Sequence, residues 1–420
     1  MNKWTEKRFD NLLFNVGLVL RLVFAKKNRK WIRCVMCLTI LGFLYRTWVY
    51  FVMKRDVERY FIINSEPYRD DYCVIYDYWP VDSIYNETVT LTLHATLPFV
   101  EYLEEHVGVW SGAISVGVLM PSPSQMGTKL ASKTFVDGLS KIELLEKSRL
   151  SGKVGIHLFY ERPIFGSCGE IIVDAWEMTR DEDYLTFLFP KSRPTPYYPV
   201  NTARNVARLG AKSRLFLSCD TENLPVNNYE PRMRKLAQKE LIEKGQKMVL
   251  VHRRFEIADA AELPKSKTEL FELYKLEYAL EFHKNFYPAG HSIPFVDEWF
   301  QVPEDKNETS IFKIVDYNNG EWEPQFVGDT LAVPLHDESF PYPNRGHTEL
   351  GYETCRAGFK FAVVNDLFTM HIGVKTGQSN AEKKGVRSWE PSYLRVVDRY
   401  LRRLDKAYPE TNKKCGLFKP

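Results

Sequence analysis

The chain has 420 residues, of which 44% are hydrophobic and 26% are charged. This balance is typical of a globular protein with a sizeable core and excludes a chain that is disordered throughout. The formal net charge is only +3, so composition gives no reason to expect a nucleic-acid partner.

The N-terminal part predicts a membrane anchor. Residues 1–33 form a basic tail with the cluster "KKNRKWIR", and residues 34–53, "CVMCLTILGFLYRTWVYFVM", form an apolar run. About 20 apolar residues can cross a bilayer as a helix, although Arg46 interrupts this run. The basic flank predicts a cytosolic N-terminus and an uncleaved signal anchor, as in a single-pass type II membrane protein. A buried core helix is the alternative.

Other features are compatible with a luminal location for the rest of the chain. Sequons begin at Asn86 and Asn307, both in hydrophilic surroundings, and predict glycosylated surface loops. Two of the seven cysteines fall inside the proposed span, so the other five form at most two disulfides, whose pairing the sequence leaves open. No Cys-x-x-Cys pair lies outside the span, which argues against a zinc site.

Beyond the span, strands and helices are expected to alternate. Residues 54–88 have few periodic signals and predict a stem or short linker. From Val89, "VTLTLHATL" predicts a strand, "PFVEYLEEHVGVW" a helix and "AISVGVLMP" a second strand, and the helix-to-strand step recurs over 199–219 and 229–252. The pattern predicts an α/β domain over 89–420 with a mostly parallel central sheet.

An acidic pair follows one predicted strand. Asp220 and Glu222 come directly after the apolar run in "RLFLSCDTENLP", and ligands of parallel sheets bind at the carboxyl ends of strands. Two such carboxylates can hold a hard cation that neutralises a departing diphosphate. Far downstream, "DLFTMHIGVKTG" offers His371 as a third ligand and Lys375 as a cation for a phosphate oxygen. The alternative is a polar turn that caps the next helix.

Four segments resemble glycosyltransferase family 49, which contains β-1,4-glucuronyltransferase and the LARGE-type xylosyl/glucuronyl transferases that act on the dystroglycan glycan. They are "VTLTLHATLPFVEYLEEHVGVWSGAISVGVLMP", "YPVNTARNVARLGAKSRLFLSCDTENLP", "FVDEWF" and "WEPQFVGDTLAVPLHDESFPYPNRGHTELGYETCRAGFKFAVVNDLFTMHIGVK". The resemblance implies a GT-A fold, a UDP-sugar donor, Mn²⁺ (or Mg²⁺) and a type II Golgi membrane anchor. It also implies inverting transfer of glucuronic acid, xylose or N-acetylglucosamine to a glycan or glycoprotein acceptor.

The resemblance also assigns roles to single residues. Asp220 matches the last Asp of the DxD motif of the family, and His371 matches its C-terminal metal ligand. Arg204 and Asn205 match the "RN" pair before the acidic strand end, where they would shape the donor pocket.

The chain departs from the family at the first Asp of this motif, which is Ser218 here. Three outcomes are open. Glu222 takes over as a ligand, or Asp220 and His371 suffice with water in the coordination shell. In the third, the metal site is impaired and the protein is a glycan-binding or scaffold protein without turnover.

An inverting transfer also needs a base that takes the proton of the acceptor hydroxyl. Asp337 in "HDESF" is the first choice and Glu353 the second, with solvated surface acids as the alternative. Two aromatic residues are candidates for stacking on acceptor sugars, or else are packing residues: Trp322 and Tyr342. Two cations are candidates for a donor carboxylate, or else are surface charge: Arg253 and Arg254.

Overall fold

The computed structural model describes residues 29–124, 128–164, 166–191, 198–342, 344–377 and 380–419. Side chains at 29–34, 50–58, 380–382 and 384–391 lie outside this description. The chain divides into two compact units. Unit 1 comprises Met1–Phe61 and Asp174–Trp176, and unit 2 comprises Ile62–Val173 and Glu177–Pro420.

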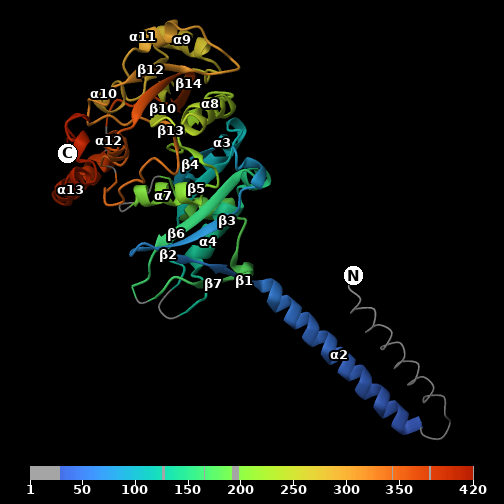
Figure 1. Ribbon diagram of the computed structural model, residues 1–420. Helices are drawn as coiled ribbons and strands as arrows, with labels where there is room; N and C mark the ends of the chain where they lie inside the picture. Colours follow the sequence, from blue (N-terminus) through green and yellow to red (C-terminus); the bar gives the residue numbers. More distant parts are fainter. Residues whose placement is uncertain are drawn as a thin grey trace. The chain divides into compact units, whose positions relative to one another are not determined.

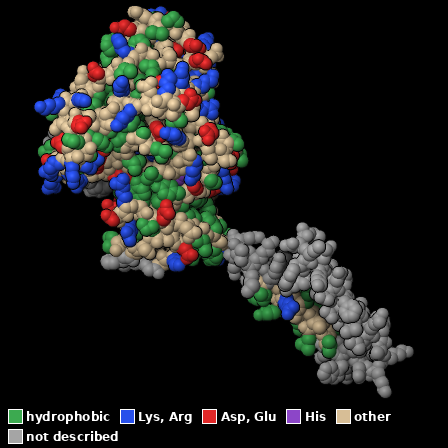
Figure 2. Space-filling view, in the orientation of Figure 1, with side chains coloured by type: hydrophobic (Ala, Val, Ile, Leu, Met, Phe, Trp, Pro, Cys, Tyr) green, Lys and Arg blue, Asp and Glu red, His purple; other side chains and the backbone are tan. Residues whose placement is uncertain are grey.

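Unit 1 contains helix α2 (Arg29–Arg59), which includes the predicted membrane span. Most of the predicted basic tail, residues 1–28, lies outside the described residues. Side chains are described over 35–49; they are mostly exposed and apolar, with Arg46 among them (Figure 2). No helix in the described part of the chain is both long enough and apolar enough to cross a membrane.

Unit 2 is built around a 12-stranded sheet (Figure 1). Its strands, in spatial order, are β12 (Ile311–Val315), β14 (Lys360–Ile372), β10 (Met248–Ile257), β13 (Phe326–Asp329), β8 (Leu215–Ser218), β4 (Val89–Thr96), β5 (Ile114–Leu119), β6 (Val154–Glu161), β3 (Tyr72–Trp79) and β2 (Glu66–Tyr68). Beside this row, β11 (Ala279–Glu281) pairs with β10, and β9 (Asn223–Pro225) pairs with β14. A separate two-stranded sheet joins β1 (Tyr60–Asn64) and β7 (Glu170–Asp174).

The sheet is mixed, and the prediction of a mostly parallel sheet is wrong. Strands β4, β5, β6 and β8 run parallel, as do β10 and β14. Strand β13, however, lies between β8 and β10 and is antiparallel to both. It has only four residues and follows an irregular loop, so no hairpin or helix-to-strand signal marks it in the sequence.

The predicted elements around the parallel strands are confirmed. "VTLTLHATL" forms β4, "AISVGVLMP" forms β5, and the segment between them forms a 3₁₀ turn, η2 (Leu97–Tyr102), followed by α3 (Leu103–Val109). The other helices are α4 (Lys133–Glu143), α5 (Glu146–Leu150), α6 (Glu182–Leu188), α7 (Val200–Gly210), α8 (Tyr229–Ala237), α9 (Lys267–Lys275), α10 (Pro288–His291), α11 (Val296–Gln301), α12 (Thr348–Arg356) and α13 (Asn380–Ala407). Short 3₁₀ segments are η1 (Ser83–Tyr85), η3 (Ala175–Glu177) and η5 (Pro409–Thr411), and α8 continues as a π-helix, η4 (Gln238–Glu243).

The segment predicted as a stem contributes to the sheet. Within 54–88, strands β2 and β3 pair with each other, and β3 pairs antiparallel with β6. A disulfide joins Cys73 in β3 to Cys168. Unit 2 therefore begins before the predicted boundary at Val89.

Helix α7 lies directly against β4, β5 and β6 (Figure 1). Gly117 in β5 permits this approach, because a Cβ atom there would lie 2.2 Å from the Ala203 carbonyl oxygen. Ser115 in β5 also donates a hydrogen bond to the Ala207 carbonyl oxygen at 2.5 Å. These contacts fix the helix that carries Arg204 and Asn205.

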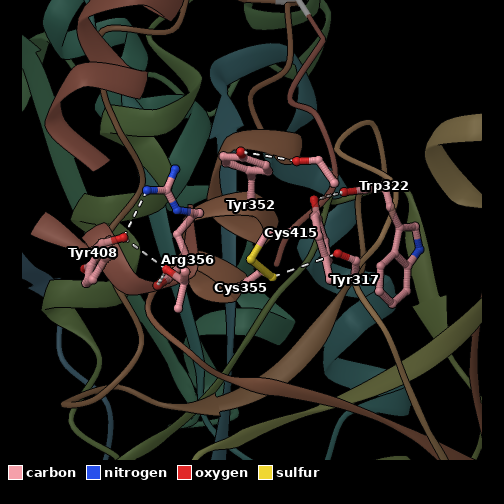
Figure 3. Close-up of a disulfide and its surroundings, with 9 residues drawn as sticks. Tyr317, Trp322, Tyr352, Cys355, Arg356, Tyr408 and Cys415 are labelled. Carbon is pink, nitrogen blue, oxygen red and sulfur yellow. Dashed lines mark hydrogen bonds between the residues drawn. A yellow bond between two sulfur atoms is a disulfide. The ribbon is translucent and has the colours of Figure 1, made fainter. Parts of the chain in front are cut away.

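The C-terminal half has its own hydrophobic cluster, which includes side chains of β10 and β14. A second disulfide, Cys355–Cys415, joins α12 to the C-terminal segment (Figure 3). Two disulfides among the five cysteines outside the predicted span match the expected maximum, and Cys219 remains a free, buried thiol.

Candidate functional site

The candidate site lies at the carboxyl ends of β4 and β8. These strands are parallel, with Thr92 opposite Ser218, so His94 and Asp220 follow at the same end of the sheet. His94 Nε2 lies 3.2 Å from Asp220 Oδ1. Ligands of open α/β sheets bind at this edge, so the predicted position of Asp220 at a strand end is consistent with a binding site.

Asp220 accepts three hydrogen bonds on one oxygen. Arg204 Nη2 donates to Oδ1 at 2.9 Å, and the Nε2 atoms of His94 and His347 lie 3.2 Å and 3.3 Å from it. Arg204 also donates to the carbonyl oxygen of Gly346, the residue before His347. The arginine therefore ties α7, the end of β8 and the start of α12 to one carboxylate.

A hydrogen bond with Tyr198 determines the tautomer of His94. Its hydroxyl lies 2.8 Å from His94 Nδ1, which accepts this hydrogen bond when Nε2 carries the proton and donates to Asp220. Tyr342 packs edge-on against Tyr198 with ring centroids 5.9 Å apart, and its side chain is 47% exposed. Of the two aromatic candidates for the acceptor, Tyr342 therefore lies beside the Asp220 cluster.

The electrostatics of the cluster keep Asp220 ionised. Burial alone raises the pKa of Asp220, but the interaction with His347, the hydrogen bond from His94 and the charge of Arg204 hold that pKa well below its usual value. Burial lowers the pKa of His94, and it lowers the pKa of His347 to about 4. Both imidazoles are thus neutral at neutral pH, and Arg204 is the cation in direct contact with the carboxylate.

Arg254 and Glu323 extend the cluster from β10 and the loop before β13. Arg254 Nη2 donates to the Glu323 carbonyl oxygen at 3.0 Å and to His291 Nδ1 at 2.6 Å. Burial lowers the pKa of His291 well below its usual range, so this imidazole is a neutral acceptor. Burial also raises the pKa of Glu323, whose Oε1 accepts a hydrogen bond from Thr348.

The three predicted metal ligands come close in the fold without forming a ligand set. Strand β9 places Asn223 opposite His371 in β14, three residues from Asp220. His371 Nε2 lies 3.9 Å from Glu222 Oε2, whereas the contacts of Asp220 are to Arg204 and the two histidines. Among the described residues, no group of three His, Cys, Asp or Glu side chains is arranged to hold a metal ion. The side chains present therefore do not fit the implied ion.

The other two residues predicted on the donor side are Asn205 and Lys375. Asn205 donates to the His336 carbonyl oxygen at 2.9 Å and to Glu338 Oε1 at 2.6 Å, so it fastens α7 to the following loop. The main-chain N–H of Lys375 donates to Glu256 Oε1 at 3.2 Å, and its Nζ lies 4.8 Å from the centroid of the Phe286 ring. Asn205 thus acts through the scaffold.

Trp322 lies in the core. It is 5% exposed and packs against Tyr317 and Phe361 with ring centroids 5.4 Å away in both cases. Figure 3 shows its ring beside Tyr317, close to the Cys355–Cys415 disulfide. A buried ring cannot stack on an acceptor sugar, so this geometry supports the packing alternative.

The two candidate bases share an arginine of α13. Arg403 forms a fork with Glu353, with N–O distances of 2.8 Å and 2.6 Å, and its Nη2 also lies 3.1 Å from Asp337 Oδ2. Both carboxylates are thus engaged by the same guanidinium, so neither is left free to receive an acceptor hydroxyl. The base role of Asp337 and Glu353 stays a prediction that this pairing does not favour.

We expect Arg403→Met to lower the free energy of unfolding by about 2–3 kcal/mol, since it leaves two partly buried carboxylates without their cation. Solvent screening keeps the effect below that of a fully buried pair, because Arg403 is 45% exposed. Arg402→Met is the matched control, since Arg402 is 72% exposed beside Asp398. Urea unfolding measures both variants, and equal effects would contradict the structural role.

The same pairing predicts that Asp337→Asn keeps turnover within about threefold, far from the 10²- to 10⁴-fold loss expected for a general base. Initial rates of UDP release test this variant. A loss of turnover with unchanged unfolding would return the base role to Asp337.

Both predicted glycosylation sites are on the surface. Asn86 follows η1, and Asn307 lies in the loop before β12; both side chains are exposed. Their glycosylation stays a prediction.

A sequence profile of the family described as "Glycosyl-transferase for dystroglycan" matches residues 88–409, which is most of the chain. The chain belongs to this family. The matched part begins at the N-terminal end of β4 and includes α12, β14 and the whole of α13. Every residue of the Asp220 cluster therefore lies within the family region.

Named relatives of this family member include two β-1,4-glucuronyltransferases 1. The protein from Danio rerio is 28% identical over 221 residues, which cover 52% of this chain and 49% of the relative. The protein from Homo sapiens is 26% identical over 219 residues, which cover 52% of this chain and 50% of the relative. The chain thus matches about half the length of these curated relatives.

A likeness to a solved structure is slight. The crystal structure of GalNAc-T7 with UDP, GalNAc and Mn²⁺ matches 80% of this chain and 56% of that chain at 12% identity, with a TM-score of 0.40. At this score the likeness carries no argument about fold or activity.

Five residues reach the site without having been predicted there: His94, Tyr198, His347, His291 and Glu323. His94 lies in an alternating strand pattern that marks it only as a strand residue. Its place at the carboxyl end of β4, matched to Asp220 across the strand pair, was the one signal that could have singled it out.

Proposed function

We propose that the protein transfers a sugar from a UDP-sugar to a glycan or glycoprotein acceptor, with inversion and on a GT-A fold. Family membership supports the reaction class. One structural observation carries the proposal: Arg204 pairs with Asp220 at the carboxyl ends of the central strands, and the charge of Asp220 also acts on the buried Arg254. Charged groups gathered at this edge are typical of a functional site, because burying them costs desolvation free energy that packing alone does not repay.

The site residues have distinct tasks in the proposed reaction. Arg204 and Arg254 supply positive charge where the diphosphate departs, and Asp220 fixes Arg204 and the two imidazoles in position. Tyr342 offers an exposed ring for an acceptor sugar. A bound Mn²⁺ would supply the same charge neutralisation, but the described side chains do not gather as its ligands.

We also propose that unit 2 works in the Golgi lumen. The two disulfides support this, since such bonds persist in the oxidising secretory compartments and are rare in the cytosol. The exposed sequons at Asn86 and Asn307 are compatible with it. The proposed donor sugar is glucuronic acid, xylose or N-acetylglucosamine.

A UDP-release assay tests the proposed function. The full chain, expressed in a secretory host, is incubated with each UDP-sugar and an oligosaccharide acceptor, in Mn²⁺ and in EDTA. We expect acceptor-dependent UDP release with at least one donor. No release with any donor, together with retained acceptor binding, would favour a glycan-binding or scaffold protein, the alternative raised by Ser218 in place of the first Asp.

A further inference from the structure

Arg254 is a buried cation, and the described part of the chain supplies no carboxylate in contact with it. It is 8% exposed, and its Nη2 donates to one carbonyl oxygen and one neutral imidazole. Among the described residues, no carboxylate oxygen lies within 4.0 Å of its guanidinium. Burying a charge costs free energy unless an opposite charge or a full set of acceptors compensates.

Other buried arginines of the chain have such compensation. Arg253, the preceding residue, lies 3.7 Å from Glu281 and donates to the carbonyl oxygens of Ile293 and Pro294. Arg208 has no carboxylate in contact but donates to three carbonyl oxygens. Arg254 has neither arrangement among the described residues: apart from its two acceptors, its guanidinium lies 4.4 Å from the centroid of the Phe282 ring. An anionic ligand would supply the missing countercharge.

Arg254 lies at the candidate site around Asp220. In the parallel β10–β14 pair it lies opposite Thr369, two residues before His371. The carboxylates whose charges act on it are Asp220 and Glu323. Asp220 is already paired with Arg204, and Glu323 contacts Arg254 only through its main-chain oxygen.

We propose that Arg254, together with Arg204, binds the diphosphate of the donor directly, so that donor binding requires no divalent metal ion. This inference rests on the proposed function. A guanidinium can donate to two phosphate oxygens at once and supplies the charge that a metal ion would otherwise supply. Two observations agree with diphosphate binding by arginines without a metal ion. Ser218 stands in place of the first Asp, and Glu222 and His371 contact each other in place of a metal triad.

Calorimetric titration of the full chain with UDP, in EDTA and in Mn²⁺, tests the inference. We expect UDP to bind in EDTA, with a Kd within about threefold of that in Mn²⁺, since the arginines carry the charge. Arg254→Gln should weaken binding about 10- to 100-fold, because charge-assisted hydrogen bonds to phosphate are lost. Arg254→Lys, which keeps the charge, should recover part of this loss.

The controls separate the possible failures. Arg402→Gln, an exposed arginine on α13, should leave UDP binding unchanged. Binding that requires Mn²⁺ would overturn the inference and leave the proposed function standing, whereas no binding in either condition would overturn both. If Arg254→Gln weakens UDP-glucuronate but not UDP or UDP-xylose, the residue binds a sugar carboxylate and the diphosphate assignment is wrong. If Arg254→Gln does not fold, Arg254→Lys alone decides, and unchanged UDP binding by it would count against the inference.

Discussion

Asp220→Asn is expected to lower kcat/KM by about 100-fold or more, an effect of the size seen when one electrostatic group of an active site is removed. The reason lies in the three contacts on Oδ1. An amide is neutral and cannot hold Arg204 by charge, and its oxygen accepts the imidazole N–H groups more weakly. The cation that faces the diphosphate would then lose its fixed position.

Glu222→Gln is the matched control, because both acids belong to the same motif. Glu222 is 52% exposed, and its carboxylate lies 3.9 Å from His371. We expect this variant to stay within about threefold of the parent, as is usual for an exposed acid. Rates of UDP release, with thermal unfolding as a folding check, measure both. Equal losses in the two variants would point instead to a metal site shared by Asp220, Glu222 and His371.

Removal of the Cys355–Cys415 disulfide should cause a large loss of stability. The bond closes a sequence separation of 60 residues, for which loop-closure entropy predicts about 4 kcal/mol. It also ties α12 to the C-terminal segment, near which Arg356 donates to the Tyr408 carbonyl oxygen at 3.1 Å (Figure 3). Because His347 directly precedes α12, the double variant Cys355→Ser/Cys415→Ser should lose donor binding as it unfolds.

The free cysteine Cys37 supplies the control for this prediction. Cys37→Ser removes a thiol but no disulfide, so it should not change the urea midpoint of unit 2. Tryptophan fluorescence follows unfolding, and Trp322 packs against Tyr317, whose carbonyl oxygen contacts Cys355. A double variant with an unchanged midpoint would show that packing of the surrounding aromatic cluster, and not the bond, holds the chain end.

The sequence by itself determined the local elements. Alternation over 89–97 and the 3.6-residue pattern over 199–211 became β4 and α7 within a residue or two. The acidic pair was placed at a strand end, and the number of disulfides was bounded correctly. The strand and helix follow from the hydrophobic periodicity of consecutive residues, and the limit on disulfides follows from the number of cysteines. Neither depends on contacts between distant parts of the chain.

Only the tertiary structure decided which residues meet. His347 reaches Asp220 across 127 residues, and Arg403 pairs with Asp337 across 66. The insertion of β13 between β8 and β10, which makes the sheet mixed, brings the loop that carries Glu323 to Arg254. Periodicity reports which face of an element is buried but not what it is buried against. The roles of these charged side chains depend on partners that long-range strand pairing alone selects.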